Sequence, residues 1–124
     1  MIEIDNKLKK LIENNALGFA TIDKGGNPHC IAVGYVKVVS KNQILITNDY
    51  MFETIKNIQQ NNNVALVVWN KDWKENCIGY ELKGITDYFT KGKWHEMIKK
   101  IPENKGESCI GAILVTINKV KRLA

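Results

Sequence analysis

The chain has 124 residues, of which 44% are hydrophobic and 25% are charged. These proportions are ordinary for one folded domain, which we expect over residues 1–124. No apolar run approaches the roughly 20 residues that a membrane-spanning helix needs. The first ten residues carry charges and lack the apolar stretch of a secretion signal. We therefore expect a cytoplasmic protein without a membrane partner.

The formal net charge of +5 comes from 17 lysines and one arginine, Arg122, against 13 acidic residues. The lysines are spread along the whole chain, which indicates a solvated surface. Specific base recognition relies heavily on arginine, so we expect no nucleic-acid partner. The three cysteines, Cys30, Cys77 and Cys109, are odd in number and widely spaced. This pattern argues against a disulfide framework and against a metal site.

Three segments have apolar residues at helical spacing, and six others are alternating or β-branched apolar runs. We expect helices near residues 4–14, 50–60 and 94–101, the last one stopped by Pro102. A bulge or a close approach is expected at Gly34, and a basic tail after residue 117. The strands are expected at Leu17–Asp23, Pro28–Val39, Gln43–Thr47, 64–69, 78–89 and Ile110–Ile117. So many short strands need closure, which predicts a mainly β fold with short helices that forms a small barrel.

The stretch Gln43–Trp69 reads as strand, polar turn, helix and strand. The turn at Thr47–Asp49 leads into the start of the second helix. The first amides of a helix have no internal partner and carry the positive end of the helix dipole, so this junction could hold a phosphate. Asn48 and Asp49 could equally serve only as helix caps.

Nucleophilic and metal chemistry have little support in this sequence. His29 and Cys30 are neighbours on a strand and therefore point to opposite faces. His95 stands beside Glu96 without the spacing of a metal-binding motif. No catalytic residue can be named, and such a barrel with one anion site is typical of proteins whose cofactor performs the difficult step.

The order of these elements resembles the flavin-binding split-barrel family, which includes pyridoxamine 5'-phosphate oxidase and small FMN-binding proteins. The resemblance covers roughly residues 4–120. It rests on the hairpin Gly26–His29, on the helix motif Thr54-x-x-Asn57-Ile58 with the Asn-Val-Ala-Leu strand after it, and on Lys83-Gly84. The resemblance implies a six-stranded split β-barrel that forms a homodimer with FMN at the subunit interface.

The resemblance also assigns FMN contacts to particular residues of this chain. The strand beside the isoalloxazine ring corresponds to Ile31, Ala32, Val33 and Gly34. Small residues there allow a flat ring to approach, or they only mark a bulge. The ring and the ribityl chain correspond to contacts from Thr47, Asn48, Asp49, Tyr50 and Met51. The phosphate corresponds to Thr54 and its neighbours, while Lys56 could fold back toward it or remain solvated.

Two departures from the family pattern affect the expected activity. Small members commonly carry lysine where this chain has Glu53, and a carboxylate repels a phosphate dianion. The arginines and the basic C-terminal motif of pyridoxamine 5'-phosphate oxidases are missing, so that specific activity is not expected. We expect an FMN-dependent oxidoreductase or an electron carrier with a small-molecule redox partner.

Exposed apolar side chains independently predict a homodimer, because Trp69, Trp73, Tyr80 and the apolar last strand exceed what one core can cover. One rival interpretation is a non-enzymatic barrel that holds haem, through His29 or His95, a deazaflavin, or no cofactor at all. Another is an oligonucleotide-binding barrel with stacking aromatic residues Tyr35, Trp69, Tyr80 and Tyr88. Core packing explains these aromatic residues equally well.

Overall fold

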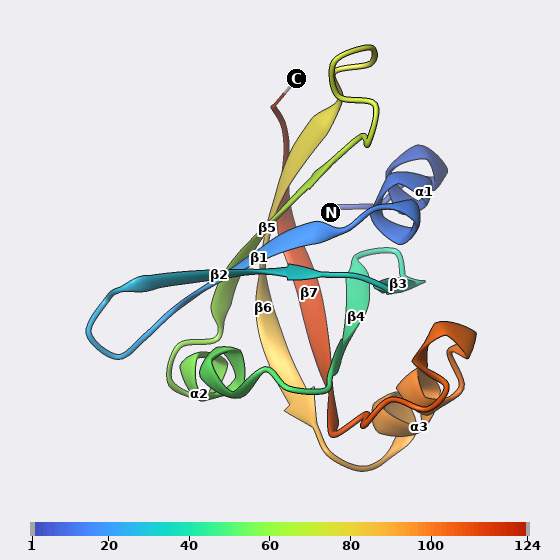
Figure 1. Cartoon of the computed structure of the whole chain (residues 1–124). Coiled ribbons are helices and arrows are strands. Elements are labelled where there is room, and N and C mark those ends of the chain that lie inside the picture. The colour runs from blue at the N-terminus through green and yellow to red at the C-terminus, as the bar shows by residue number, and fades with distance from the viewer. Residues whose placement is uncertain (1, 124) are drawn as a thin grey trace.

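The computed structural model describes residues 2–123, and its strands form one seven-stranded antiparallel sheet that curls into a split barrel (Figure 1). The strand order is β2-β1-β5-β6-β7-β4-β3. The elements are α1 (Asn6–Asn14), β1 (Leu17–Ile22), β2 (Pro28–Val33), β3 (Lys37–Ser40), β4 (Gln43–Asn48), α2 (Phe52–Gln60), β5 (Asn63–Trp69), β6 (Gly79–Phe89), α3 (Lys93–Lys99), a 3₁₀ turn (Pro102–Asn104) and β7 (Gly111–Arg122).

The two edge strands of the sheet, β2 and β3, come from the stretch that the sequence pattern predicts as one long strand. The structure interrupts this stretch between Val33 and Lys37. Tyr35 has a φ of 55°, a left-handed conformation that breaks strand pairing. Gly34 has open space where a Cβ would lie, so it marks this turn and not a close approach. The sheet therefore has seven strands in place of the predicted six, because hydrophobic spacing does not reveal a backbone turn inside an apolar run.

The last strand, β7, extends through the segment predicted to be a basic tail. It pairs with β6 as far as Tyr80 opposite Arg122. Lys83 pairs with Lys119 while Gly84 pairs with Ile117, which leaves one extra residue in β7 as a bulge. Lysines alternate with Val120, which packs against the core, so this end of β7 has one apolar and one charged face. The high lysine content concealed a strand in the sequence.

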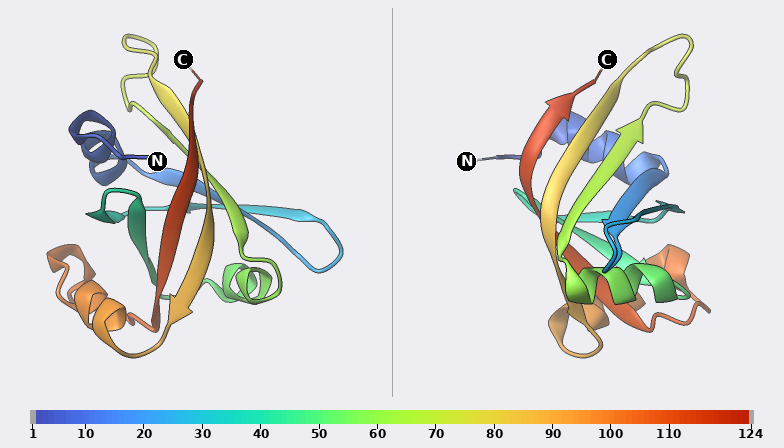
Figure 2. Two further views of the ribbon diagram at one scale, coloured as in Figure 1. Left: turned by 180° about the vertical axis from the view of Figure 1, so that it is seen from behind. Right: turned by 90° about the vertical axis from the view of Figure 1, so that its left-hand side faces the viewer.

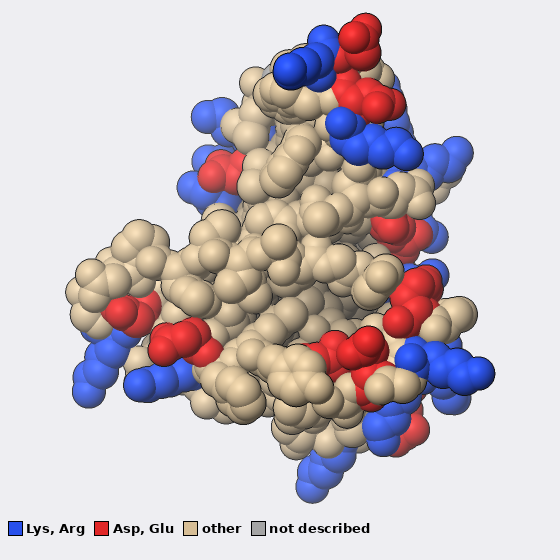
Figure 3. Space-filling view, viewed as in Figure 1, with Lys and Arg blue, Asp and Glu red and all other residues tan. Residues whose placement is uncertain are grey.

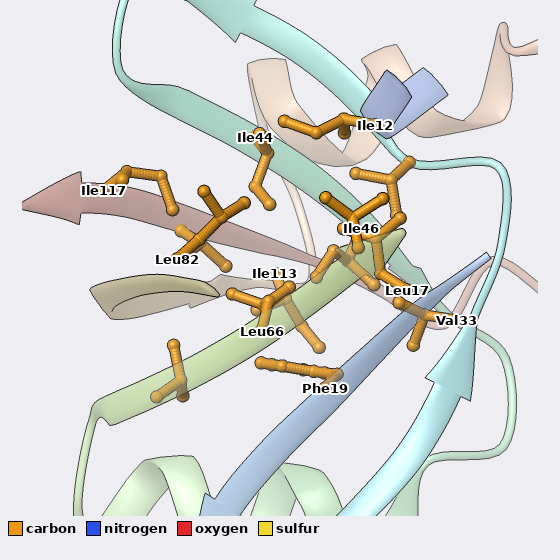
Figure 4. Packing of buried hydrophobic residues seen from close by; sticks show 14 of the residues in the cluster. Ile12, Leu17, Phe19, Val33, Ile44, Ile46, Leu66, Leu82, Ile113 and Ile117 are labelled. Atoms are coloured by element: carbon orange, nitrogen blue, oxygen red, sulfur yellow. The ribbon is translucent and has the colours of Figure 1, made fainter. Parts of the chain in front are cut away.

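Two apolar clusters hold the sheet and its helices together. The main cluster fills the barrel with side chains from α1 and the strands, and Figure 4 shows them converging from Ile12, Leu17, Phe19, Val33, Ile44, Ile46, Leu66, Leu82, Ile113 and Ile117. The smaller cluster lies under α3 and includes Leu45, Ile98 and Leu114. Successive residues of a strand point to opposite faces, so β4 contributes to both clusters and is buried on both sides.

Helices α1 and α2 cover different parts of the barrel, as the two views of Figure 2 show. In α1, the Asp5 carboxylate caps the helix by accepting from the Leu8 amide at 2.8 Å. The Glu13 carboxylate accepts from the Val38 amide of edge strand β3 at 2.9 Å, which ties α1 to that edge. Helix α2 packs on β1. None of the helices within residues 2–123 is long and apolar enough to cross a membrane.

The bulge between β6 and β7 makes Gly84 indispensable. A Cβ at this position would overlap the backbone carbonyl oxygen of Thr116. We expect Gly84→Ala to lower the free energy of unfolding by about 1–3 kcal/mol, since backbone must move to admit the methyl group. Urea denaturation measures this loss. The matched control, Gly34→Ala, has open space and should change stability by less than about 0.5 kcal/mol; equal losses for both variants would contradict the packing argument.

Candidate cofactor-binding site

The predicted site begins where β4 ends, and its first two side chains are buried by the fold itself. Thr47 is 8% exposed and Asn48 is 5% exposed. The Asn104 amide donates to the Thr47 hydroxyl at 2.9 Å. The side-chain amide nitrogen of Asn48 donates to the Tyr88 hydroxyl at 2.8 Å. The side-chain oxygen of Asn48 accepts from the Met51 backbone amide, also at 2.8 Å. Both polar groups therefore shape the turn and are not directed at a ligand.

The next two residues are bonded to the loop that precedes β7. One oxygen of Asp49 accepts from the Cys109 amide at 2.7 Å. The Ser108 hydroxyl donates to the Tyr50 hydroxyl at 3.0 Å. Cys109 has a φ of 46° and its carbonyl oxygen lies 2.7 Å from His95 Nε2, so that nitrogen carries the hydrogen and donates. Residues 47–50 are thus fixed, one after another, by side-chain bonds to distant parts of the chain.

Helix α2 starts at this turn with few groups suited to an anion. Met51 occupies the N-cap position without a side-chain cap, and the first turn carries the carboxylate of Glu53. Phe52 is 75% exposed, whereas Thr54 is 1% exposed. The Thr54 hydroxyl is therefore inaccessible to a ligand, and the side chains that do reach the surface here are an aromatic ring and an acid.

Lys56, the predicted cation of the site, is exposed and acts on the β1–β2 hairpin turn. The pKa of the Asp23 carboxyl lies below its ordinary value, chiefly because the Asn27 backbone amide donates to it. The positive charge of Lys56 lowers this pKa in the same direction. Lys56 is thus an exposed lysine whose charge has the smallest of the effects on this pKa.

The pKa of the Cys109 thiol depends on the charged groups beside this turn. Burial raises the pKa of Cys109, and the carboxylates of Asp49 and Glu107 raise it further, while Lys99 lowers it. Acids thus outnumber bases among the charges that act on this thiol. Figure 3 shows acidic atoms in the lower middle of the face, between the positions of α2 and α3.

The other predicted contact residues lie in β2. They share only the main apolar core with the predicted contact residues at the β4–α2 junction. Ile31 is half-buried and packs against the main cluster, as does Met51 from the α2 junction, and Val33 belongs to that cluster. Ala32 and Gly34 are exposed. Gly34 borders a hollow of about 570 Å³ that is also lined by Glu13, Asn14, Asn15, Ala16, Tyr35 and Glu103.

The residues that fix this turn could not be found from the sequence pattern. Tyr88, Asn104, Ser108 and Cys109 lie 40 to 60 residues away from their partners. No spacing rule connects such positions. A buried asparagine within a polar loop, as at Asn104, is a signal only once its burial is known.

Comparisons with known proteins identify the family of this chain. The sequence model of the family described as pyridoxamine 5'-phosphate oxidase matches residues 4–121. The chain belongs to the pyridoxamine 5'-phosphate oxidase family. An uncharacterized protein of Methanocaldococcus jannaschii is 28% identical over 131 aligned positions, which cover 99% of this chain and 83% of that protein.

Two solved structures share the split-barrel fold of this family. HupZ from Group A Streptococcus has a TM-score of 0.87 at 20% identity, over 97% of this chain and 94% of that one. An FMN-binding protein from Syntrophomonas wolfei subsp. wolfei has a TM-score of 0.83 at 16% identity, over 94% of this chain and 83% of that one. At such identities the likeness establishes the fold, and the expected split barrel is confirmed.

The residues of this family member suit the two ends of FMN unequally. Ala32 in β2 is small and exposed and leaves the strand backbone accessible to a flat ring, while Ile31 and Met51 are half-buried and pack against the main core. The phosphate end finds a different environment, because Thr54 is buried and Glu53 occupies the first turn of α2. The start of α2 therefore does not fit a phosphate.

The residues invoked by the rival interpretations lie apart from one another. His95 is committed to the Cys109 carbonyl oxygen, and His29 is half-buried in β2. Among the aromatic residues, Tyr80 and Tyr88 pack against the main core, while Tyr35 and Trp69 are exposed on different elements. These positions form neither a haem ligand pair nor a row of stacking platforms on one strand.

The Asn104–Thr47 bond should anchor the predicted site. We expect Asn104→Ala to lower the free energy of unfolding by about 1–3 kcal/mol, because Asn104 is buried and donates to both the Thr47 hydroxyl and the Ile98 carbonyl. Chemical denaturation measures the loss. Tyr50→Phe removes the exposed bond to Ser108 between the same two segments and should cost less than about 0.5 kcal/mol. A small effect of Asn104→Ala would show that the anchor is dispensable.

Proposed function

We propose that this chain is a flavin-binding redox protein, an FMN-dependent oxidoreductase or electron carrier that acts as a homodimer in the cytoplasm. The observation that carries the proposal is the family match over residues 4–121, supported by the fold shared with an FMN-binding protein. A bound flavin would supply the redox chemistry, and the chain would bind its ring and limit solvent access.

The proposed position of the ring is between the end of β2 and the junction of β4 with α2. Ala32 is small and exposed, so the backbone of β2 is accessible to a flat ligand. On the other side, Tyr50 and Phe52 are 70% and 75% exposed. Exposed aromatic side chains beside a rigid turn favour contact with a planar ring. The hydrogen bonds of residues 47–50 would hold this surface in place.

Oxidation of pyridoxamine 5'-phosphate itself is not part of the proposal. Recognition of a phosphorylated substrate relies on arginine, whose planar fork matches the phosphate oxygens. The single arginine of the chain, Arg122, lies in β7 opposite Tyr80 in β6. The physiological substrate would therefore be a different small molecule.

The proposed dimer interface is the outer face of β2, β1 and β5. Cross-strand neighbours on this face are small or apolar, since Ala20 pairs with both Cys30 and Ala65, and Gly18 pairs with both Ala32 and Val67. In the right-hand view of Figure 2 these strands lie side by side, with α1 and α3 behind them. A flat face of small residues allows two sheets to approach closely.

The same face continues into a hollow walled by tryptophan. Trp69 and Trp73 are each 43% exposed and line a space of about 280 Å³ with Val67, Gly79 and Leu123. This agrees with the sequence argument for exposed tryptophans. Tyr80 and most of β7, which the same argument included, are instead packed in the molecule. Burial of this face against a second copy would remove its apolar surface from water.

Ala65→Glu tests the proposed interface. The new carboxylate would lie at the centre of the face, opposite Lys83 in β6, so the monomer can tolerate it. We expect sedimentation equilibrium to show a dimer for the wild type and a species of about half that mass for the variant, because burial of the new carboxylate against a second copy would remove it from water. Gln59→Glu, on the exposed face of α2, is the matched control and should remain dimeric. A monomeric wild type would overturn the dimer.

Flavin binding is tested by fluorescence quenching. We expect FMN to be quenched on titration with the protein, and FAD to bind more weakly by at least about tenfold, or ~1.4 kcal/mol. FAD brings a second phosphate and an adenosine to the α2 junction, where acids predominate. Heat-denatured protein is the control for nonspecific quenching. Absence of quenching by any flavin would overturn the proposal, and a Soret band in the purified protein would favour haem.

A further inference from the structure

We infer that the start of α2 holds no phosphate, so that this chain selects a flavin by its ring and binds the unphosphorylated form, riboflavin, at least as tightly as FMN. The inference rests on the proposed flavin site and specifies the ligand class at one of its ends. It assigns Glu53 as a specificity-determining residue that disfavours anionic ligands.

The first argument is the charge at the helix start. Anions bind the first turn of a helix through free amides and the positive end of the dipole. Here Glu53 supplies a negative charge in that same turn, and Asp49 supplies another in the preceding turn of the chain. Both carboxylates would repel a phosphate bound at the start of the helix. Glu53 therefore already places a negative charge in the turn where a bound anion would lie.

The second argument is that the polar groups expected to bind the phosphate are committed elsewhere. The Thr47 hydroxyl accepts from Asn104, and the Asn48 amide is bonded to Tyr88. Thr54 is 1% exposed. None of these three side chains can turn toward a ligand without breaking the packing or the hydrogen bonds that form the turn.

The third argument is the balance of the charges beside the junction. Lys56 is exposed on α2, and Glu53 lies in the first turn of the same helix. The charges that act on the Cys109 thiol, next to Asp49, are those of two acids, Asp49 and Glu107, and one base, Lys99. These groups do not supply the excess of positive charge that favours a phosphate dianion.

The groups that do reach the surface suit a neutral, hydroxyl-bearing ligand end. Tyr50 and Phe52 are 70% and 75% exposed and offer apolar contact. Carboxylates such as that of Glu53 accept hydrogen bonds from hydroxyl groups. The ribityl chain of riboflavin ends in a hydroxyl, whereas that of FMN ends in a phosphate. The Glu53 carboxylate repels the phosphate of FMN, but it can accept a hydrogen bond from the terminal hydroxyl of riboflavin.

The experiment compares riboflavin with FMN on three proteins by fluorescence quenching. These are the wild type, Glu53→Lys, and the control Glu75→Lys, which makes the same charge change in the exposed loop between β5 and β6. We expect the wild type to bind riboflavin at least as tightly as FMN. Glu53→Lys should raise FMN affinity about tenfold relative to riboflavin, or ~1.4 kcal/mol, and the gain should shrink at high salt. Glu75→Lys should leave the ratio unchanged.

Wild-type protein that binds FMN more tightly than riboflavin would overturn the inference, as would a ratio that Glu53→Lys leaves unchanged. If neither flavin binds, the proposed function fails and the inference is decided separately with inorganic phosphate. Amide chemical shifts of residues 52–54 should then stay constant on adding phosphate to the wild type and move in Glu53→Lys. Shifts of these amides in the wild type would show that the helix start does accept phosphate.

Discussion

The barrel depends on the connection between its two edge strands. β2 and β3 are separated by residues 34–36, so the end of one and the start of the other lie within about 14 Å along the chain. The edges of a flat sheet of seven strands would lie about 29 Å apart. The sheet must therefore curl until its edges approach, and the left-handed Tyr35 directs the chain across the opening. Burial of Val36 and the bond from Val38 to Glu13 of α1 stabilise this closure.

Curling gives the sheet an inside and two unequal outer regions. The inside is filled by the main core, and α3 covers the outer side of β4 and β7. The outer side of β2, β1 and β5 carries small residues and two tryptophans, which is why we place a second copy there. Ala32 belongs to this outer face and also to the proposed ring position, so the second copy and the ligand are proposed to meet at the end of β2.

At that junction, structure and binding compete for the same polar groups. The side chains of Thr47, Asn48 and Asp49 are hydrogen-bonded to Asn104, Tyr88 and Cys109 respectively, which makes the turn rigid. Rigid placement favours a ligand that is recognised by shape, because little conformational entropy is lost on binding. It also removes the donors that a phosphate needs. The proposed preference for a neutral ligand follows from these commitments and from the carboxylate of Glu53 in the first turn of α2.

The sequence by itself determined the three helices and the alternation of buried and exposed residues, because hydrophobic spacing is a local property of each element. The order of these elements and a few short motifs indicated the family and its split barrel, and marked Glu53 as a departure. Only the tertiary structure decided that Pro28–Val39 divides at Tyr35, that the lysine-rich end of β7 is a strand, and that Thr54 is buried. Features of this kind depend on partners distant in the chain, as Thr47 depends on Asn104 and Asn48 on Tyr88, and hydrogen bonds between distant residues leave no periodic trace in a sequence.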